Sequence, residues 1–399
     1  MVKLIRIIGT LKRFKRLIIR GVIILFAFIL ICVLIAATTG FQIQKNPMVH
    51  FFSQHEKIDT VQWCKTISKE LIYEDIDFMV KTIEEVHPDP FAYISRNDFY
   101  KKADSIKQSI KNDLTRDELK QNISGLLNTI KDGHTQIKFP EISGGEDNKS
   151  NFDNAHNEGG KIVRYDKLND STGYLWVKDF VIDKKDFCNQ IDTVFKKIHY
   201  DSINNLIIDI RNNPGGNSEL ADYLISSIYN QHYKTSSKIL IKRSEQYYKY
   251  MRGYFSWWFK PFLIFIKQIN DYRQTSVGEV YEDIKGFKNP VNMQYRFTGK
   301  TYLLINSNTF STALGFATVF KDYAVGNIIG ETTRSEVNEF GDIYPFDLPN
   351  SGLWVWCSAK RYIRPSGEMT IGGLKPDIPV EDIDDNILEY TIRMINNEK

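Results

Sequence analysis

Two patterns of hydrophobic positions divide the chain beyond its N-terminal segment. Between residues 71 and 132, apolar residues recur every three or four positions, which is typical of the buried face of a helix. The predicted helices cover 71–87, 99–110 and 116–132. The third begins at a capping box, Thr115-Arg116-Asp117-Glu118. Residues 56–137 are therefore predicted to form a small helical subdomain.

The pattern changes after residues 141–160, a polar stretch that we interpret as a loop. Short apolar runs predict strands, and amphipathic segments between them predict helices. The strands cover 173–180, 205–210, 302–306 and 327–330, and the helices cover 187–199, 218–229 and 311–320. Strands that alternate with helices of this length indicate crossover connections and a mostly parallel sheet. We therefore expect an α/β core over 161–390.

The first 44 residues have a different character. Seven basic residues and no acidic residue occur in 1–20, and no charged residue occurs from Gly21 to Gln44. About 20 apolar residues cross ~30 Å of hydrocarbon, and a basic flank marks the cytoplasmic side. We expect a cytoplasmic segment over 1–20, a single-pass transmembrane signal anchor over 21–41 and a linker over 42–55. The rest of the chain would then lie outside the cytoplasm. A signal peptide cleaved near Ala36-Ala37 is the alternative.

Charge and cysteine content exclude several classes of function. Without the seven N-terminal basic residues, the 45 that remain are outnumbered by 49 acidic residues. The chain after residue 20 is therefore net negative, and it has no electrostatic reason to bind nucleic acid. Four cysteines in 399 residues exclude a disulfide scaffold, and no Cys-x-x-Cys occurs. We expect no metal site and no cofactor.

Two loops that follow predicted buried strands carry candidate chemistry. Residues 211–216 end in two glycines before a helix, and Ser311 begins the next helix along the sheet edge. Ligands of parallel sheets bind at the carboxyl ends of the strands. A serine there can attack a carbonyl while free N–H groups stabilise the oxyanion. The alternative is a serine that only caps its helix.

A serine nucleophile needs a base, and few histidines follow the N-terminal segment. His134 occurs in Asp132-Gly133-His134-Thr135, just past a predicted helix, where a turn can project a side chain. We take His134 as the candidate base. The alternative is a turn histidine with local hydrogen bonds only.

Together these motifs resemble the tail-specific, or C-terminal-processing, serine peptidases, in the branch with the tricorn protease core. Five motifs in the family's order carry the resemblance over roughly residues 70–385. They are residues 132–135, 206–216, 309–313, 330–333 and 373–377. The resemblance implies a crotonase-like α/β core, with Ser311 as nucleophile and His134 as base. Backbone N–H groups of Gly215 or Gly216 and of Thr312 would form the oxyanion hole.

The sequence departs from the family pattern at three points. The lysine of the Ser–Lys branch is absent from residues 330–336, which favours a Ser–His mechanism. Thr370 replaces the acid that orients the histidine in the tricorn branch. The candidates for that acid are Glu368, Glu336 and Glu339. Residues 136–172 are too short for a PDZ domain.

The expected function is a membrane-anchored serine endopeptidase that acts on peptides or proteins outside the cytoplasm. Two alternatives stay open. One is a catalytically inactive relative that binds peptides or apolar ligands, and the other is a hydrolase of other acyl bonds.

One further stretch stands apart from these motifs. Residues 247–269 are crowded with aromatic residues and flanked by lysine and arginine. They predict either a core helix or a helix that lies on a membrane surface or covers the cleft.

Overall fold

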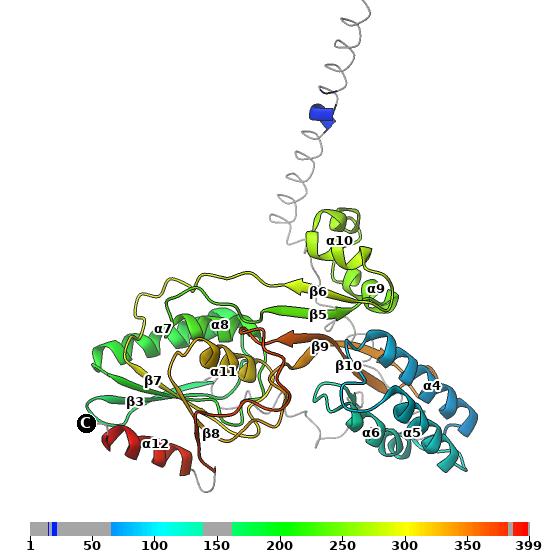
Figure 1. The fold of residues 1–399 in the computed structure, drawn as a ribbon, viewed down its shortest axis with the longest axis horizontal. Helices are drawn as coiled ribbons and strands as arrows, with labels where there is room; N and C mark the ends of the chain where they lie inside the picture. The colour runs from blue at the N-terminus through cyan, green and yellow to red at the C-terminus, as the bar shows by residue number, and fades with distance from the viewer. Residues whose placement is uncertain (1–14, 16–17, 22–64, 139–161, 382–385, 398–399) are drawn as a thin grey trace, which may run out of the picture.

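The structure is a computed structural model that describes residues 15, 18–21, 65–138, 162–381 and 386–397 (Figure 1). The predicted anchor over 21–41 lies almost entirely outside these residues, and the linker over 42–55 lies wholly outside them. Within the described ranges, no helix is both long and apolar enough to span a membrane. The anchor therefore stays a prediction.

A six-stranded sheet forms the core of the larger part of the molecule. Its strands, in order across the sheet, are β11 (Ile378–Pro379), β8 (Asn327–Gly330), β7 (Lys300–Ile305), β4 (Asn205–Asp209), β3 (Thr172–Val177) and β2 (Val163–Lys167). Every neighbouring pair is parallel except β2 with β3. The structure therefore has the mostly parallel sheet that the alternating pattern predicts.

Helices cover both faces of this sheet. They are α7 (Lys184–Tyr200), α8 (Ser218–Ser226) and α11 (Thr312–Asp322) on one face and α12 (Asn386–Asn397) on the other (Figure 1). Successive strand residues point to opposite faces. Ile208 of β4 is accordingly buried in the core with α7, α8 and α11. Its neighbour Ile207 is buried in the smaller core with α12.

The sequence pattern did not predict a second, antiparallel sheet. Its path is β1 (Gln136–Lys138), β10 (Trp354–Ile363), β5 (Lys238–Lys242) and β6 (Val280–Ile284), and β9 (Phe340–Asp347) also pairs with β10. Gln136 of β1 lies opposite Trp356 of β10. This pairing joins the end of the N-terminal helical part to the C-terminal third of the chain.

Three helices pack against this second sheet. They are α4 (Lys69–Val86), α5 (Arg96–Ser109) and α6 (Arg116–Leu127). The predicted capping box is present, with reciprocal bonds between Thr115 and Glu118. Helix α6 is shorter than predicted, because the chain tightens into the 3-10 turn η1 (Asn128–Ile130). Lys131 then adopts a φ of 55° and turns the chain toward β1.

The connection from β5 to β6 forms a separate lobe. It contains α9 (Glu245–Gly253), η3 (Lys260–Phe265) and α10 (Lys267–Gln274), and residues 245–274 are called the β5–β6 lobe below. The aromatic stretch 247–269 is thus divided among three short helices. The proposed domain boundaries at 56–137 and 161–390 and the crotonase-like relationship stay predictions.

The central sheet generates a prediction about stability. Ile208→Ala removes a fully buried side chain from β4, so it should lower the free energy of unfolding by about 2–5 kcal/mol. Ile284→Ala, in β6, removes the same atoms from a side chain that is 67% exposed, and should cost about 0.5 kcal/mol or less. Denaturant unfolding of both variants checks this. Equal losses would contradict the described placement of these strands.

Candidate active site

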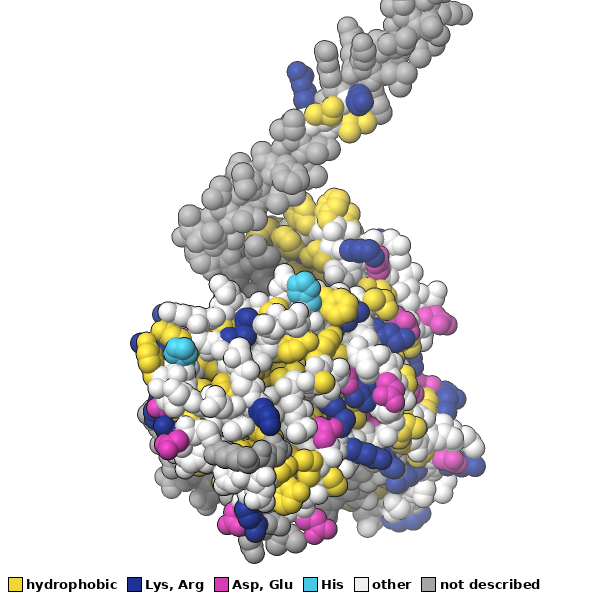
Figure 2. Space-filling model, turned by 60° about the vertical axis from the view of Figure 1, so that its left-hand side comes forward, with side chains coloured by type: hydrophobic (Ala, Val, Ile, Leu, Met, Phe, Trp, Pro, Cys, Tyr) yellow, Lys and Arg dark blue, Asp and Glu magenta, His cyan; other side chains and the backbone are white. Residues whose placement is uncertain are grey.

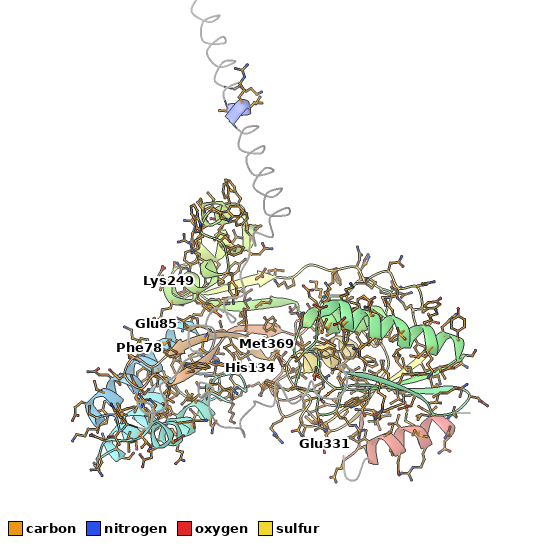
Figure 3. The ribbon with its side chains drawn as sticks, turned by 180° about the vertical axis from the view of Figure 1, so that it is seen from behind. Phe78, Glu85, His134, Lys249, Glu331 and Met369 are labelled. Carbon is orange, nitrogen blue, oxygen red and sulfur yellow. The ribbon has the colours of Figure 1, made fainter. Side chains whose placement is uncertain are left out.

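Two side chains from distant parts of the chain meet between the two sheets. Ser311 lies in the loop from β7 to α11, and His134 lies in the turn between η1 and β1. The Nε2 atom of His134 is 3.3 Å from the Oγ atom of Ser311. Figure 3 shows His134 at the junction of the two sheets. A histidine at this distance can accept the proton of a serine hydroxyl.

The backbone of Ser311 adopts a rare conformation. Its φ is 51° and its ψ is −128°, although it is not a glycine. Such a conformation costs of order 1–3 kcal/mol and persists only where surrounding contacts hold it. Ser311 precedes the first residue of α11, yet its side chain makes no capping hydrogen bond. The hydroxyl is therefore directed to His134 instead of to the helix.

Hydrogen bonds on both sides of the loop hold this conformation. The hydroxyl of Thr309 accepts the N–H of Asn306 at 3.1 Å and donates to the Ile210 carbonyl at 3.2 Å. The N–H of Phe310 donates to the Asn213 carbonyl at 3.0 Å. The loop after β7 is thus tied to the loop after β4.

Gly215 and Gly216 differ in what their N–H groups do. The Gly215 N–H donates to Oδ1 of Asn213 at 2.9 Å. The N–H groups of Gly216 and Thr312 have no acceptor in the described part of the chain. Both residues line a cavity of about 400 Å³ together with His134 and Ser311. Of the three expected donors, Gly216 and Thr312 are therefore the available pair.

Only glycine fits at position 215. Its φ is +92°, and a Cβ atom there would lie 2.7 Å from the amide nitrogen of Thr312. The close approach also lets the Thr312 hydroxyl donate to the Gly216 carbonyl at 2.6 Å. The glycine loop therefore packs directly on the residues around Ser311.

Asp132 organises the other side of the histidine. Its Oδ1 atom accepts the backbone N–H of His134 at 3.0 Å and lies 3.8 Å from the Nδ1 atom of that imidazole. Its Oδ2 atom accepts the Thr135 hydroxyl at 2.5 Å and lies 3.3 Å from Nε2 of His87. The His134 ring stacks on Phe310, with centroids 4.6 Å apart. These contacts fix the ring beside Ser311.

The model of peptidase family S41 matches residues 171–380, which is more than half of the chain. The chain belongs to peptidase family S41. It is a serine peptidase, and its α/β core has the fold of that family.

The solved structures that match this peptidase share little sequence with it. The crystal structure of a candidate peptidase from Parabacteroides merdae is 19% identical, with a TM-score of 0.59 over 82% of this chain and 96% of that chain. A lipoprotein from Streptococcus agalactiae is 13% identical, with a TM-score of 0.48 over 82% and 96%. A photosystem II D1 C-terminal processing protease is 12% identical, with a TM-score of 0.43 over 79% and 94%. A comparison with curated proteins found no match.

Buried charges set the titration of the histidine in this peptidase. Burial alone would lower the pKa of His134, but the nearby carboxylates of Asp132 and Glu339 outweigh burial and raise that pKa. Burial alone would raise the pKa of the Asp132 carboxyl. Its interactions with the imidazoles of His134 and His87 outweigh burial and hold that pKa well below its usual range. Asp132 is therefore a fixed negative charge beside the imidazole.

Glu339 is a second carboxyl group near the histidine. It lines the cavity of about 400 Å³ and another of about 360 Å³, both of which also contain His134. Its Oε2 atom is buried without a hydrogen-bond partner in the described residues. Burial raises the pKa of Glu339 to about 7. The Glu339 carboxyl therefore changes its charge near neutral pH.

The other two candidate acids have different partners. Glu336 also lines the smaller cavity, but its Oε2 atom accepts the N–H of Gly372 at 2.7 Å. Glu368 lines neither cavity, its side chain is 62% exposed, and it lies 3.4 Å from a guanidinium nitrogen of Arg364. The structure therefore brings Glu339 toward His134 and leaves Glu368 at the surface.

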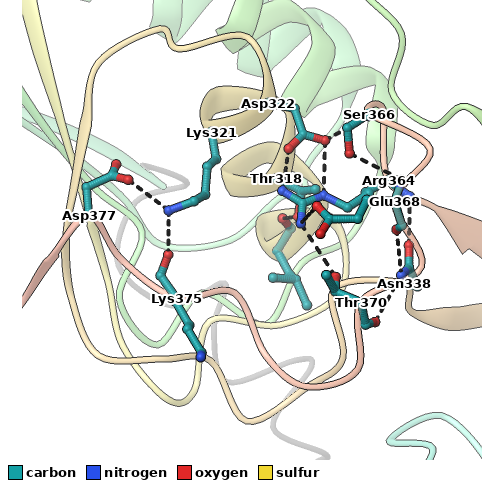
Figure 4. Close-up of polar contacts among 11 residues, drawn as sticks. Thr318, Lys321, Asp322, Asn338, Arg364, Ser366, Glu368, Thr370, Lys375 and Asp377 are labelled. Carbon is teal, nitrogen blue, oxygen red and sulfur yellow. Dashed lines mark hydrogen bonds and ion pairs between the residues drawn. The ribbon is translucent and has the colours of Figure 1, made fainter.

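Thr370 belongs to a network that fixes the segment after β10 (Figure 4). Arg364 pairs with the carboxylate of Asp322 through two nitrogens. The side-chain amide of Asn338 donates to the carbonyls of Glu368 and Thr370, at 3.0 and 3.1 Å. This network positions the segment, but its residues other than Arg364 line neither cavity at His134.

Sequence reasoning overlooked Asp132 as an acid, although it stands two residues before the histidine in a quoted motif. The signal was a carboxylate at the end of a helix, where it can accept N–H groups of the following turn. In the described ranges, no group of three or more His, Cys, Asp or Glu side chains could hold a metal ion.

The charges around His134 predict its titration. An NMR titration of the imidazole should have its midpoint above the ordinary value of about 6.5, because carboxylates stabilise the protonated ring. Glu339→Gln removes one of those charges and should move the midpoint to lower pH. Glu336→Gln, in the same cavity, serves as the matched control and should move it less. A wild-type midpoint below 6.5 would mean that burial dominates.

Proposed function

We propose that this serine peptidase is anchored in a membrane and hydrolyses peptide bonds outside the cytoplasm by a Ser–His mechanism. The contact of 3.3 Å between Ser311 Oγ and His134 Nε2 is the observation that carries the mechanism. The backbone of the serine is strained, and its side chain makes no capping hydrogen bond to the helix. The contact with the histidine is therefore the main polar interaction of its hydroxyl.

In the proposed reaction, neutral His134 takes the proton of Ser311 while the serine oxygen attacks the substrate carbonyl. The N–H groups of Gly216 and Thr312 then donate to the oxyanion that forms. The protonated imidazole passes its proton to the leaving amine. Water, activated by the same histidine, then releases the acyl group from Ser311.

We propose that Asp132 orients His134 and that Glu339 stabilises the imidazolium. Asp132 is ionised and holds both the backbone and one ring edge of the histidine. Glu339 is half-buried in the cavity wall, with its Oε2 atom buried, and acts on His134 through its charge. These two carboxyl groups would replace the acid whose position is occupied by Thr370. They also weaken the alternative of an inactive peptide-binding relative, because that alternative rested on Thr370.

The cavity beside Ser311 suggests which substrate side chain enters it. Beyond the serine, five apolar residues from α8, α11 and the segment before β9 line it. They are Ala221, Ile225, Phe316, Val319 and Val337. We propose that this wall accepts an apolar side chain of the peptide next to the cleaved bond, because the removal of apolar surface from water favours binding.

Ser311→Ala and His134→Ala should each reduce peptide turnover by on the order of 10³-fold or more, because members of a catalytic unit fail together. Ser311→Ala should leave stability nearly unchanged, since the side chain caps nothing. Turnover of an apolar fluorogenic peptide and a thermal melt measure both effects. Ser307→Ala, in the same loop, is the matched control and should stay active.

The same assay tests which acidic residues act on His134. Asp132→Asn and Glu339→Gln should each lower turnover more than Glu368→Gln, whose side chain lies at the surface. Near-wild-type turnover in a folded His134→Ala variant would reject the mechanism, and a larger loss from Glu368→Gln would reject the assignment of the acids.

The topology has its own test. The seven basic residues before the charge-free run predict that 1–20 stay in the cytoplasm. Protease added to intact cells should therefore degrade the chain after Gln44 and leave an N-terminal tag intact until the cells are lysed. If the chain after Gln44 survives in intact cells and is degraded only after lysis, this orientation is wrong.

A further inference from the structure

The β5–β6 lobe projects from the end of the second sheet (Figure 1), and its base packs into the core of that sheet through Tyr247 and Tyr272. Strands β5 and β6 lead into and out of it. None of its residues lines either cavity at His134. The lobe therefore lies outside both cavities at His134.

Aromatic packing gives the lobe a defined shape. Tyr247 and Tyr272 are almost fully buried, and their rings meet edge to face with centroids 6.2 Å apart. The Tyr272 hydroxyl donates to the Lys242 carbonyl at 2.9 Å, which ties α10 to the end of β5. Leu263 of η3 is also buried. The core of the second sheet thus holds the base of the lobe, and residues 257–265 beyond that base are called the tip below.

The tip presents large apolar side chains to the outside. Trp257 is 80% exposed, Phe265 is 68% exposed and Ile264 is 51% exposed. Hydrophobic side chains gather at the top of the described surface in Figure 2, at the height of this lobe. Single exposed apolar residues are ordinary, but three on one projecting tip mark a contact site.

The charge of the lobe is positive in balance, because its five basic residues outnumber Glu245 and Asp271. Residues 246–270 contain Lys249, Arg252, Lys260 and Lys267 and no acidic residue. Lys267 pairs with Asp271, whereas Lys249 and Lys260 form no ion pair within the described ranges. The tip therefore combines exposed aromatic rings with uncompensated positive charge, on a chain whose remaining body is acidic in balance.

We propose that the tip of the β5–β6 lobe binds the surface of an anionic lipid bilayer. Trp257, Ile264 and Phe265 would enter the interfacial region, where aromatic side chains are favoured. Lys260 and nearby basic residues would lie at the level of the lipid phosphates and be attracted by their charge. A second copy of the chain fits less well, because a stable protein interface buries about 800 Å² on each partner, more than three side chains on a narrow tip supply.

Such a contact would set the orientation of the body. The predicted linker over 42–55 has 14 residues, which would reach at most about 50 Å if fully extended. Such a linker would keep the body near the membrane but would not orient it. A second, weak contact through the lobe would set the orientation of the body. The proposal uses the predicted anchor only for this consequence and does not depend on the catalytic assignment.

Site-specific photo-crosslinking of the full chain in vesicles tests the contact. A photoreactive amino acid replaces Trp257 or Phe265, and matched exposed positions, Tyr200 and Ile371, serve as controls. The vesicles contain phosphatidylglycerol in phosphatidylcholine, or phosphatidylcholine alone. We expect several-fold more lipid adducts from positions 257 and 265 than from 200 and 371.

The charge contribution is measured in the same assay. Lys260→Glu/Lys267→Glu should lower the adduct yield on vesicles with phosphatidylglycerol and change it little on phosphatidylcholine alone. Lys185→Glu/Lys196→Glu, on α7, makes the same change of charge away from the lobe and should have no effect. Equal yields at all four positions would mean proximity through the tether alone. That result would overturn the proposal. Adducts to a second copy of the chain, and the absence of any lipid adducts, would overturn it as well. Each readout is the same with Ser311→Ala, so it is independent of activity.

Discussion

The close approach of two loops is the constraint on which the site depends. The loop after β4 passes so near the start of α11 that Gly215 cannot carry a Cβ atom. Hydrogen bonds from this loop hold the segment of Thr309 and Phe310, and the segment holds Ser311 in a conformation that a free chain avoids. The same approach places the N–H groups of Gly216 and Thr312 beside the serine. One packing contact thus determines both the direction of the hydroxyl and the position of the donors.

A second contact, between distant parts of the chain, places the histidine beside Ser311. Strand β1 pairs with β10, more than 200 residues later in the chain, and the turn before β1 carries Asp132 and His134. The Thr135 hydroxyl, which donates to Asp132, also accepts the N–H of Ser358 in β10. The carboxylate is therefore fixed from both sides, and its charge reaches the imidazole through a buried site where water screens little. The site lies at the boundary of two cores because each core supplies one half of it.

Much of this arrangement could be predicted from local sequence signals. The alternating apolar runs indicated the parallel sheet, and Thr115 with Glu118 indicated the start of α6. Residues 132–135 and 309–313 directed attention to His134 and Ser311, which the structure brings together. The second sheet was missed because its pairing is set by contacts between distant segments. A strand such as β6, in which no residue is fully buried, also carries little apolar signal. The choice of Gly216 over Gly215 depends on the Asn213 side chain, and the burial of Glu339 depends on the packing of β9, so neither can be read from a motif.

The central claim is that the strained backbone directs Ser311 to His134 as an activated nucleophile. The most direct test is to treat the folded full chain with a fluorophosphonate and locate the modified residue by mass spectrometry of its peptides. The account predicts a phosphonate on the oxygen of Ser311, and loss of the label in His134→Ala. A folded protein that carries the label on another serine, or that takes up none, would contradict it.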